Sequence, residues 1–151
     1  MSFAPQLAST DIMVELHVPD FAPVIDFYSK LGFKEVWRTP PKDGERSGYL
    51  VIQRGQSIIC FFCGNEEVYK QSYFRNFNRA TPRGFGVELG IYIADQPIEK
   101  FYQNVSAALE PKHIVRKLEE KHWGGKDFRV VDPFGFYLCF RTPKNILEKQ
   151  N

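Results

Sequence analysis

The sequence lacks long hydrophobic runs and has little excess of either charge sign. Its longest apolar stretches, such as residues 58–63, are far shorter than the roughly 20 residues that span a bilayer. Lys and Arg number 20 against 18 Asp and Glu, a formal net charge of +2, and no long basic run gathers them. We therefore expect neither a membrane partner nor a nucleic-acid partner recruited by bulk charge.

Cysteine is also scarce. The three cysteines, an odd number, do not make a disulfide framework. Residues 1–10 have neither the charged start nor the apolar core of a secretory signal, so a cytoplasmic protein with reduced thiols is expected. Cys60 and Cys63 have the spacing of a redox or zinc pair. They lie in an apolar, strand-like run where residues three apart point to opposite faces, which favours ordinary buried thiols.

Aromatic residues are abundant, and they exclude a disordered chain. The 14 Phe, 7 Tyr and 2 Trp need burial, and 151 residues suit one domain. We predict a single domain over residues 1–151, made of one module over about 10–63, a connector over 64–84 and a second module over about 85–142.

The chain repeats one order of elements, strand–helix–strand–strand–strand. In the first copy, Asp20 is predicted to cap a helix that Gly32 ends. In the second copy, Asp95 precedes the corresponding helix. The strands are predicted from alternating or continuous apolar patterns at 12–18, 33–37, 49–53, 57–63, 85–93, 114–118, 128–132 and 137–141.

Alternation gives each predicted sheet two different faces. The face covered by the helix takes Val, Ile and Leu, and the inner face takes Glu15, His17, Cys60, Phe62, Glu88, Tyr92, Tyr137 and Cys139. A mixed aromatic and polar lining is typical of small-molecule sites. The alternative is that the inner faces pack on each other, but a carboxylate buried without a partner is costly.

Two motifs on this repeat resemble the glyoxalase, bleomycin-resistance and extradiol-dioxygenase proteins, the vicinal oxygen chelate superfamily. The first motif runs from Val18-Pro19-Asp20 to Leu31-Gly32-Phe33. The second covers residues 123–135, where a Trp-Gly loop precedes a strand and an Asp-Pro-x-Gly turn follows it, as in the bleomycin-resistance branch. The resemblance implies an α+β fold of two βαβββ modules, with curved mixed sheets around a concave cavity and helices outside. It also implies a homodimer.

Enzymes of this superfamily hold a divalent metal at positions that fall here on Met13, Cys60, Glu88 and Cys139. Of these, Glu88 alone is a ligand type that such enzymes use, and the others are soft donors that suit copper or zinc better than a hard catalytic metal. The prediction is therefore no metal, no cofactor and no catalytic residue. Glu15 and His17 could form an acid–base pair, but no nucleophile lies beside them.

The resemblance and these residues together predict a metal-free protein that binds a small aromatic molecule, with a cationic one as an option. Bleomycin-resistance proteins sequester a drug in this way, which implies antibiotic resistance. The alternative is a metal-dependent glyoxalase-like lyase or a dioxygenase. The predicted ligand-binding residues are Glu15, His17, Trp37, Phe62, Glu88, Tyr92 and Trp123.

Overall fold

The computed structural model describes residues 12–42 and 48–144. The chain divides into two compact units, residues 1–83 and 84–151, and each is described by itself. Neither helix in the described residues is long and apolar enough to cross a membrane.

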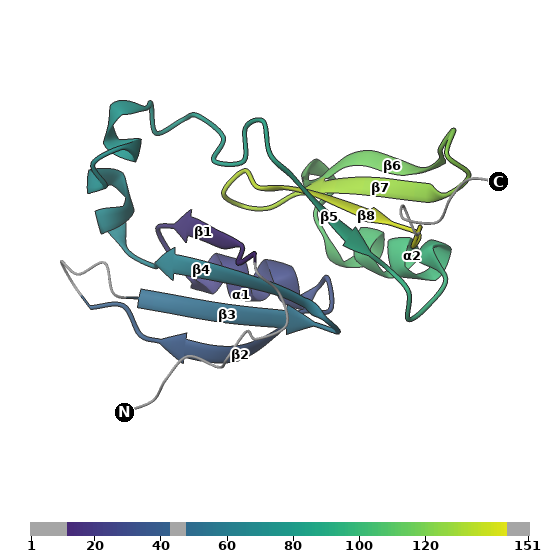
Figure 1. Ribbon diagram of the computed structural model, residues 1–151, viewed down its shortest axis with the longest axis horizontal. Helices are drawn as coiled ribbons and strands as arrows, with labels where there is room; N and C mark the ends of the chain where they lie inside the picture. The colour runs from purple at the N-terminus through teal and green to yellow at the C-terminus, as the bar shows by residue number, and fades with distance from the viewer. Residues whose placement is uncertain (1–11, 43–47, 145–151) are drawn as a thin grey trace. The chain divides into compact units, whose positions relative to one another are not determined.

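The first unit is one mixed sheet with one helix (Figure 1). Its elements are β1 (Glu15–Val18), α1 (Ala22–Ser29), β2 (Lys34–Thr39), β3 (Gly48–Arg54) and β4 (Ser57–Cys63). The strand order is β1-β4-β3-β2, in which β1 runs parallel to β4 and the other pairs are antiparallel. Two short 3-10 helices, η1 (Glu66–Lys70) and η2 (Phe74–Asn76), follow in the predicted connector.

The second unit repeats this topology. Its elements are β5 (Glu88–Tyr92), α2 (Ile98–Ala108), β6 (Ile114–Glu120), β7 (Lys126–Val131) and β8 (Tyr137–Arg141), with η3 (Pro111–His113) before β6. The strand order β5-β8-β7-β6, with β5 parallel to β8, matches the first sheet position by position. The predicted α+β fold of two βαβββ modules is confirmed.

Local sequence explains where the elements begin and end. Phe21, one residue after the predicted cap, occupies the cap position of α1, and Asp20 accepts a hydrogen bond from the Ala22 amide at 3.0 Å. Gly32 ends the helical turn with φ at +88°, where other residues would be strained. The strand predicted over 85–93 is shorter, because Gly86 at φ +80° turns the chain and the Val87 amide bonds back to the Gly84 carbonyl.

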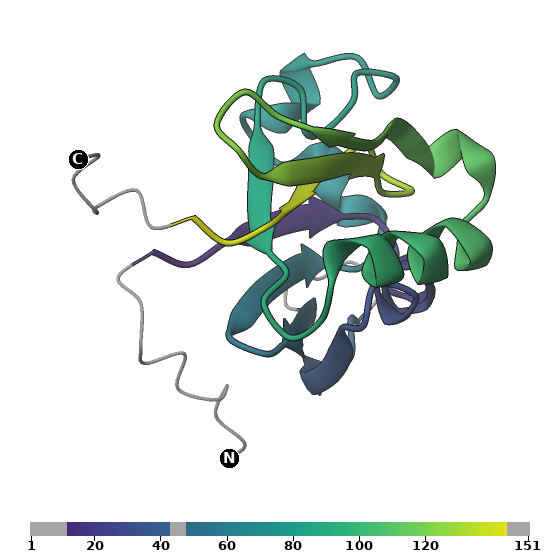
Figure 2. The same ribbon diagram turned by 90° about the vertical axis from the view of Figure 1, so that its right-hand side faces the viewer.

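Each sheet buries one face against its own helix. Tyr28 of α1 packs edge-on against Phe61 of β4, with ring centroids 5.3 Å apart. Phe101 of α2 packs on Phe128 and Phe140, at 5.8 and 5.1 Å, and Figure 2 shows α2 running across that side of its sheet. Side chains therefore alternate between this helix-covered face and an opposite face, which we call the open face of each sheet.

Candidate ligand-binding site

Strand register defines which side chains share each open face. Because Phe61 and Phe140 face helices, their sequence neighbours Cys60, Phe62, Cys139 and Arg141 face the other way. On the first open face the cross-strand partners add Glu15, His17, Trp37, Tyr49 and Val51. On the second open face they add Glu88, Gly90, Tyr92, Asp127, Arg129 and Tyr137.

The first open face is mainly aromatic. The His17 ring lies 3.5 Å from the Phe62 ring, centroid to centroid, and 4.8 Å from Phe74 of η2. The Trp37 ring lies 6.1 Å from that of Tyr49. Four of the seven predicted ligand-binding residues, namely Glu15, His17, Trp37 and Phe62, thus share one face of one sheet.

The polar groups on the first open face are bonded to one another. The Tyr49 hydroxyl donates to Glu15 Oε1 at 2.6 Å, which fixes the carboxylate beside the rings. Burial, together with hydrogen bonds to Cys60 and Glu15, raises the pKa of Tyr49 far above its usual range. Burial also raises the pKa of the Cys60 thiol, so Cys60 is a neutral lining residue at neutral pH.

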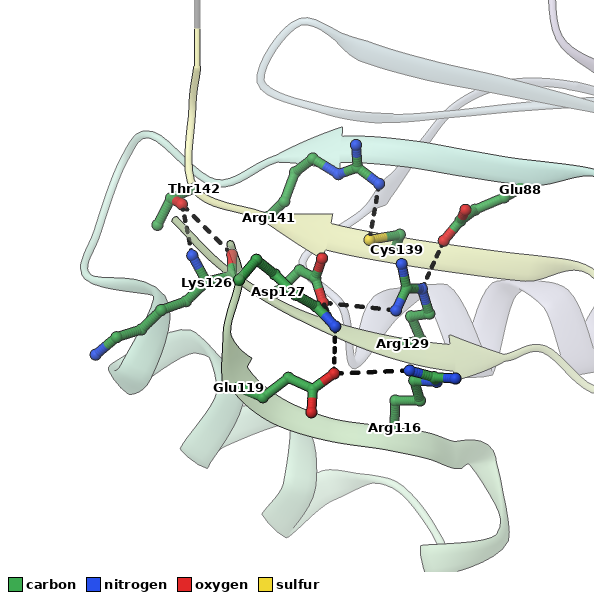
Figure 3. A network of polar contacts seen from close by, with 10 residues as sticks. Glu88, Arg116, Glu119, Lys126, Asp127, Arg129, Cys139, Arg141 and Thr142 are labelled. Atoms are coloured by element: carbon green, nitrogen blue, oxygen red, sulfur yellow. Dashed lines mark hydrogen bonds and ion pairs between the residues drawn. The ribbon is translucent and has the colours of Figure 1, made fainter. Parts of the chain in front are cut away.

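The second open face is mainly charged (Figure 3). Arg129 Nε donates to Glu88 Oε1 at 2.7 Å, and Asp127 lies 3.7 Å from Arg129 and 3.6 Å from Lys121. Partial burial opposes ionisation of Glu88, but the hydrogen bond and charge of Arg129 outweigh it and lower the pKa of Glu88. The carboxylate predicted to meet a cationic ligand is therefore already engaged by an arginine.

Trp123 lies in a different place, in the loop before β7. It lines a cavity of about 600 Å³, within the size range of small-molecule sites. Other walls of this cavity are the segment after β5, the first turn of α2 and residues 142–144. The indole packs over Gly125, where any side chain would collide with it, and Lys144 Nζ lies 5.6 Å from the ring centroid. None of the other predicted ligand-binding residues lines this cavity.

The superfamily's metal positions do not suit a hard divalent metal. Within the second unit, Glu88 is paired with Arg129, and burial raises the pKa of the Cys139 thiol, which disfavours the thiolate that a metal needs. Cys60 has the same burial effect in the first unit. Across residues 12–42 and 48–144, no three His, Cys, Asp or Glu side chains cluster closely enough to hold a metal ion.

The three cysteines are buried thiols that form no disulfide, as predicted. Sequence reasoning did not single out Tyr49, Asp127, Arg129 or Arg141. For two of them the sequence contains a usable pattern. Asp127 and Arg129 alternate with the apolar residues Phe128 and Val130, as expected for polar side chains on one face of a strand. The cross-strand register, which places Arg129 opposite Cys139 and beside Glu88, could not be predicted from this pattern.

Comparison with known proteins identifies the family. The family model for the Glyoxalase/Bleomycin resistance protein/Dioxygenase superfamily matches residues 12–140, and the chain belongs to this superfamily. A search of the curated proteins found no match.

Solved structures share the fold at low sequence identity. A bleomycin-binding protein, solved with bleomycin, is 20% identical over 90% of this chain and 100% of its own, with a TM-score of 0.60. TioX from Micromonospora sp. ML1 is 19% identical over 92% of this chain and 100% of its own, with a TM-score of 0.60. A glyoxalase/bleomycin resistance protein/dioxygenase family enzyme from Burkholderia phytofirmans PsJN is 18% identical over 86% and 95%, with a TM-score of 0.63.

Proposed function

We propose that this protein binds a small aromatic molecule without a metal and acts by sequestering it. The observation that carries this proposal is the first open face, where Trp37, Tyr49, Phe62 and His17 gather on one side of a sheet. Aromatic rings offer large, rigid contact area, and aromatic pairs gain roughly 0.5–1.5 kcal/mol beyond area burial. The fold shared with a protein solved in complex with bleomycin supports the same use of the scaffold.

Calorimetric titration with a panel of planar aromatic compounds, bleomycin included, tests the proposal. Trp37→Ala removes a ring from the first open face, and Trp123→Ala removes the indole from its cavity. We expect Trp37→Ala to weaken binding of a ligand on the first open face, and Trp123→Ala that of a ligand in its cavity, by about tenfold or more in each case. The fold should persist, because neither residue lies among the fully buried core. If no aromatic compound binds below about millimolar, or if both variants bind like the parent, the proposal is wrong.

The alternative, a metal-dependent lyase or dioxygenase, has a separate test. Elemental analysis of protein purified without chelator is expected to find no stoichiometric divalent metal, because Glu88 is engaged by Arg129 and the buried thiols are protonated. Glu88→Ala serves as the matched variant. About one Fe, Ni, Mn or Zn per chain in the parent, lost in Glu88→Ala, would favour the enzyme instead.

We further propose that the protein is a homodimer, as the family resemblance implies. Light scattering in dilute solution is expected to give about twice the chain mass of 17.5 kDa. A mass of 17.5 kDa would remove the dimer while leaving the proposal of aromatic binding to its own test.

A further inference from the structure

Arg141, at the end of β8, stands out on the second open face because no carboxylate of the described residues lies within ion-pair distance of its guanidinium. Its Nη2 donates to the Cys139 sulfur at 3.1 Å, as Figure 3 shows. Its Nε is buried and has no hydrogen-bond partner within the part of the chain that the structure describes. A guanidinium carries five N–H donors, so Arg141 has donors beyond the one that contacts Cys139.

The carboxylates nearest to Arg141 are committed to other cations. Glu88 accepts the hydrogen bond of Arg129 at 2.7 Å. Asp127, directly opposite Arg141 in the β7–β8 register, lies 3.6 Å from Lys121 and 3.7 Å from Arg129. Arg141 thus forms no ion pair within 4.0 Å among the described residues, although Glu88 and Asp127 act on its charge from a longer distance.

The strand beside Arg141 gives the guanidinium room on the sheet surface. Gly90 of β5 lies next to it, and a Cβ there would stand 3.6–3.8 Å from Cζ, Nε and Nη2. The guanidinium thus lies over the Gly90 position, at ordinary van der Waals distance from where a Cβ would stand. Arg141 as a whole is only partly buried, so a ligand can approach the guanidinium.

An aromatic residue, Tyr92, shares this open face with Arg141. Tyr92 of β5 pairs with Arg141 in the parallel register, and its side chain is 47% exposed. A planar acid bound here would contact the Tyr92 ring through its own ring. Its two oxygens would accept hydrogen bonds from the guanidinium, the geometry that arginine favours with carboxylates.

We propose that the second open face recognises a carboxylate through Arg141, so that the ligand class is a small aromatic carboxylic acid. This inference rests on the proposed function and specifies its ligand. It also accords with the weakly basic chain, whose net charge of +2 gives no general attraction for a cation. A cationic aromatic ligand is the competing outcome.

Isothermal titration calorimetry of the full chain with three matched probes tests the inference. The probes are 2-naphthoate, 2-naphthamide and 2-naphthylmethylamine, which share a ring and differ in charge. In the parent protein we expect 2-naphthoate to bind about tenfold more tightly than the amide, and the amine to bind most weakly.

Two arginine variants locate the effect. Arg141→Gln should bring the affinity for 2-naphthoate down to that for the amide, and Arg141→Lys should keep part of the preference because the charge remains. Arg116→Gln is the matched control on the same sheet. Its side chain is 59% exposed and already lies 3.7 Å from Glu119, so the preference should persist in that variant.

The outcomes separate this inference from the proposed function. If the amide or the amine binds the parent as well as 2-naphthoate does, aromatic binding stands and the carboxylate inference is overturned. The same holds if folded Arg141→Gln keeps the preference. If Arg141→Gln fails to fold, the three affinities of the parent and the preference retained by Arg141→Lys still test the carboxylate inference. If none of the three probes binds below about millimolar, the proposed function fails, and the inference fails with it.

Discussion

The two sheets of this protein have the same topology but different open faces. On the helix-covered side, equivalent register positions are apolar in both copies, as in Leu50 and Phe128, or Phe61 and Phe140. On the open faces, residues at equivalent positions differ in chemical type. Phe62 in the first sheet, for example, corresponds to Arg141 in the second. The helix-covered positions are apolar in both units, whereas the open-face positions are mainly aromatic in the first unit and mainly charged in the second.

Further open-face positions show the same divergence. Val51, which pairs with Cys60, corresponds to Arg129, which pairs with Cys139. Tyr49 in turn corresponds to Asp127. Topology and core packing are thus repeated in the two units, while the chemistry of the open-face side chains differs between them.

The largest expected effect comes from breaking a helix-covered face. Phe140 is fully buried and contacts both Phe101 and Phe128, so Phe140→Ala should lower the free energy of unfolding by about 3–5 kcal/mol. Urea denaturation followed by circular dichroism measures this loss. Phe62→Ala, on an open face and only partly buried, is the control and should cost clearly less. Equal losses would mean that the open face is also a structural core.

The helix-covered faces are also the part of the fold that the sequence predicts well. Apolar periodicity and the Gly and Pro turns sufficed for the strand–helix order and for β4 and β8 to the residue. The repeat was visible because Ile59-Cys60-Phe61 matches Leu138-Cys139-Phe140 in the same place in each copy. Burial of a regular pattern is a local property, and a single sequence contains it.

The site was less predictable, because its chemistry depends on which strands are neighbours. In the sequence, Glu88 is a carboxylate that a ligand could contact. In the structure, its carboxylate accepts a hydrogen bond from Arg129, which lies 41 residues further along the chain. Trp123 and Trp37 looked alike as flat surfaces, yet Trp123 lines a cavity with the start of α2 and Trp37 lies on a sheet face. Cross-strand register and loop conformation decide both cases, and neither is encoded in periodicity.

Cys60 and Cys139 stand at equivalent open-face positions of the two sheets, and here the residue type is the same in both units. Cys60 and Cys139 are both almost fully buried, and burial raises the pKa of each thiol. At neutral pH we expect both to react with a disulfide reagent at least about tenfold more slowly in the native protein than in urea.

Alkylation with N-ethylmaleimide followed by peptide mass spectrometry assigns the reaction to each cysteine. A Cys63→Ser background simplifies the peptide assignment, because Cys63 is also a buried thiol. Equal protection of Cys60 and Cys139 supports equivalent burial in the two units. Fast labelling of one of them in the folded protein would show that its sheet opens more readily than the other.

The smallest expected effect concerns the ion pair that distinguishes the second open face. Glu88 has a lowered pKa in the folded protein, so it contributes stability above the ordinary glutamate pKa. That contribution is lost as the pH falls through the lowered value, where the folded state takes up the proton. Because the Glu88 side chain is 37% exposed, we expect Glu88→Gln to cost only about 0.5 kcal/mol or less at pH 7.

The measurement is the difference in unfolding free energy between the parent and Glu88→Gln at pH 7 and again near pH 3. The difference should shrink at acid pH, because the protonated carboxyl resembles the amide in charge. Glu110→Gln is the control, since Glu110 is 71% exposed and lies 3.3 Å from Lys112 in a solvent-exposed pair. A loss in Glu88→Gln that stays constant with pH would contradict the charge-based account. It would assign Glu88 a packing role, and the second open face would then resemble the first.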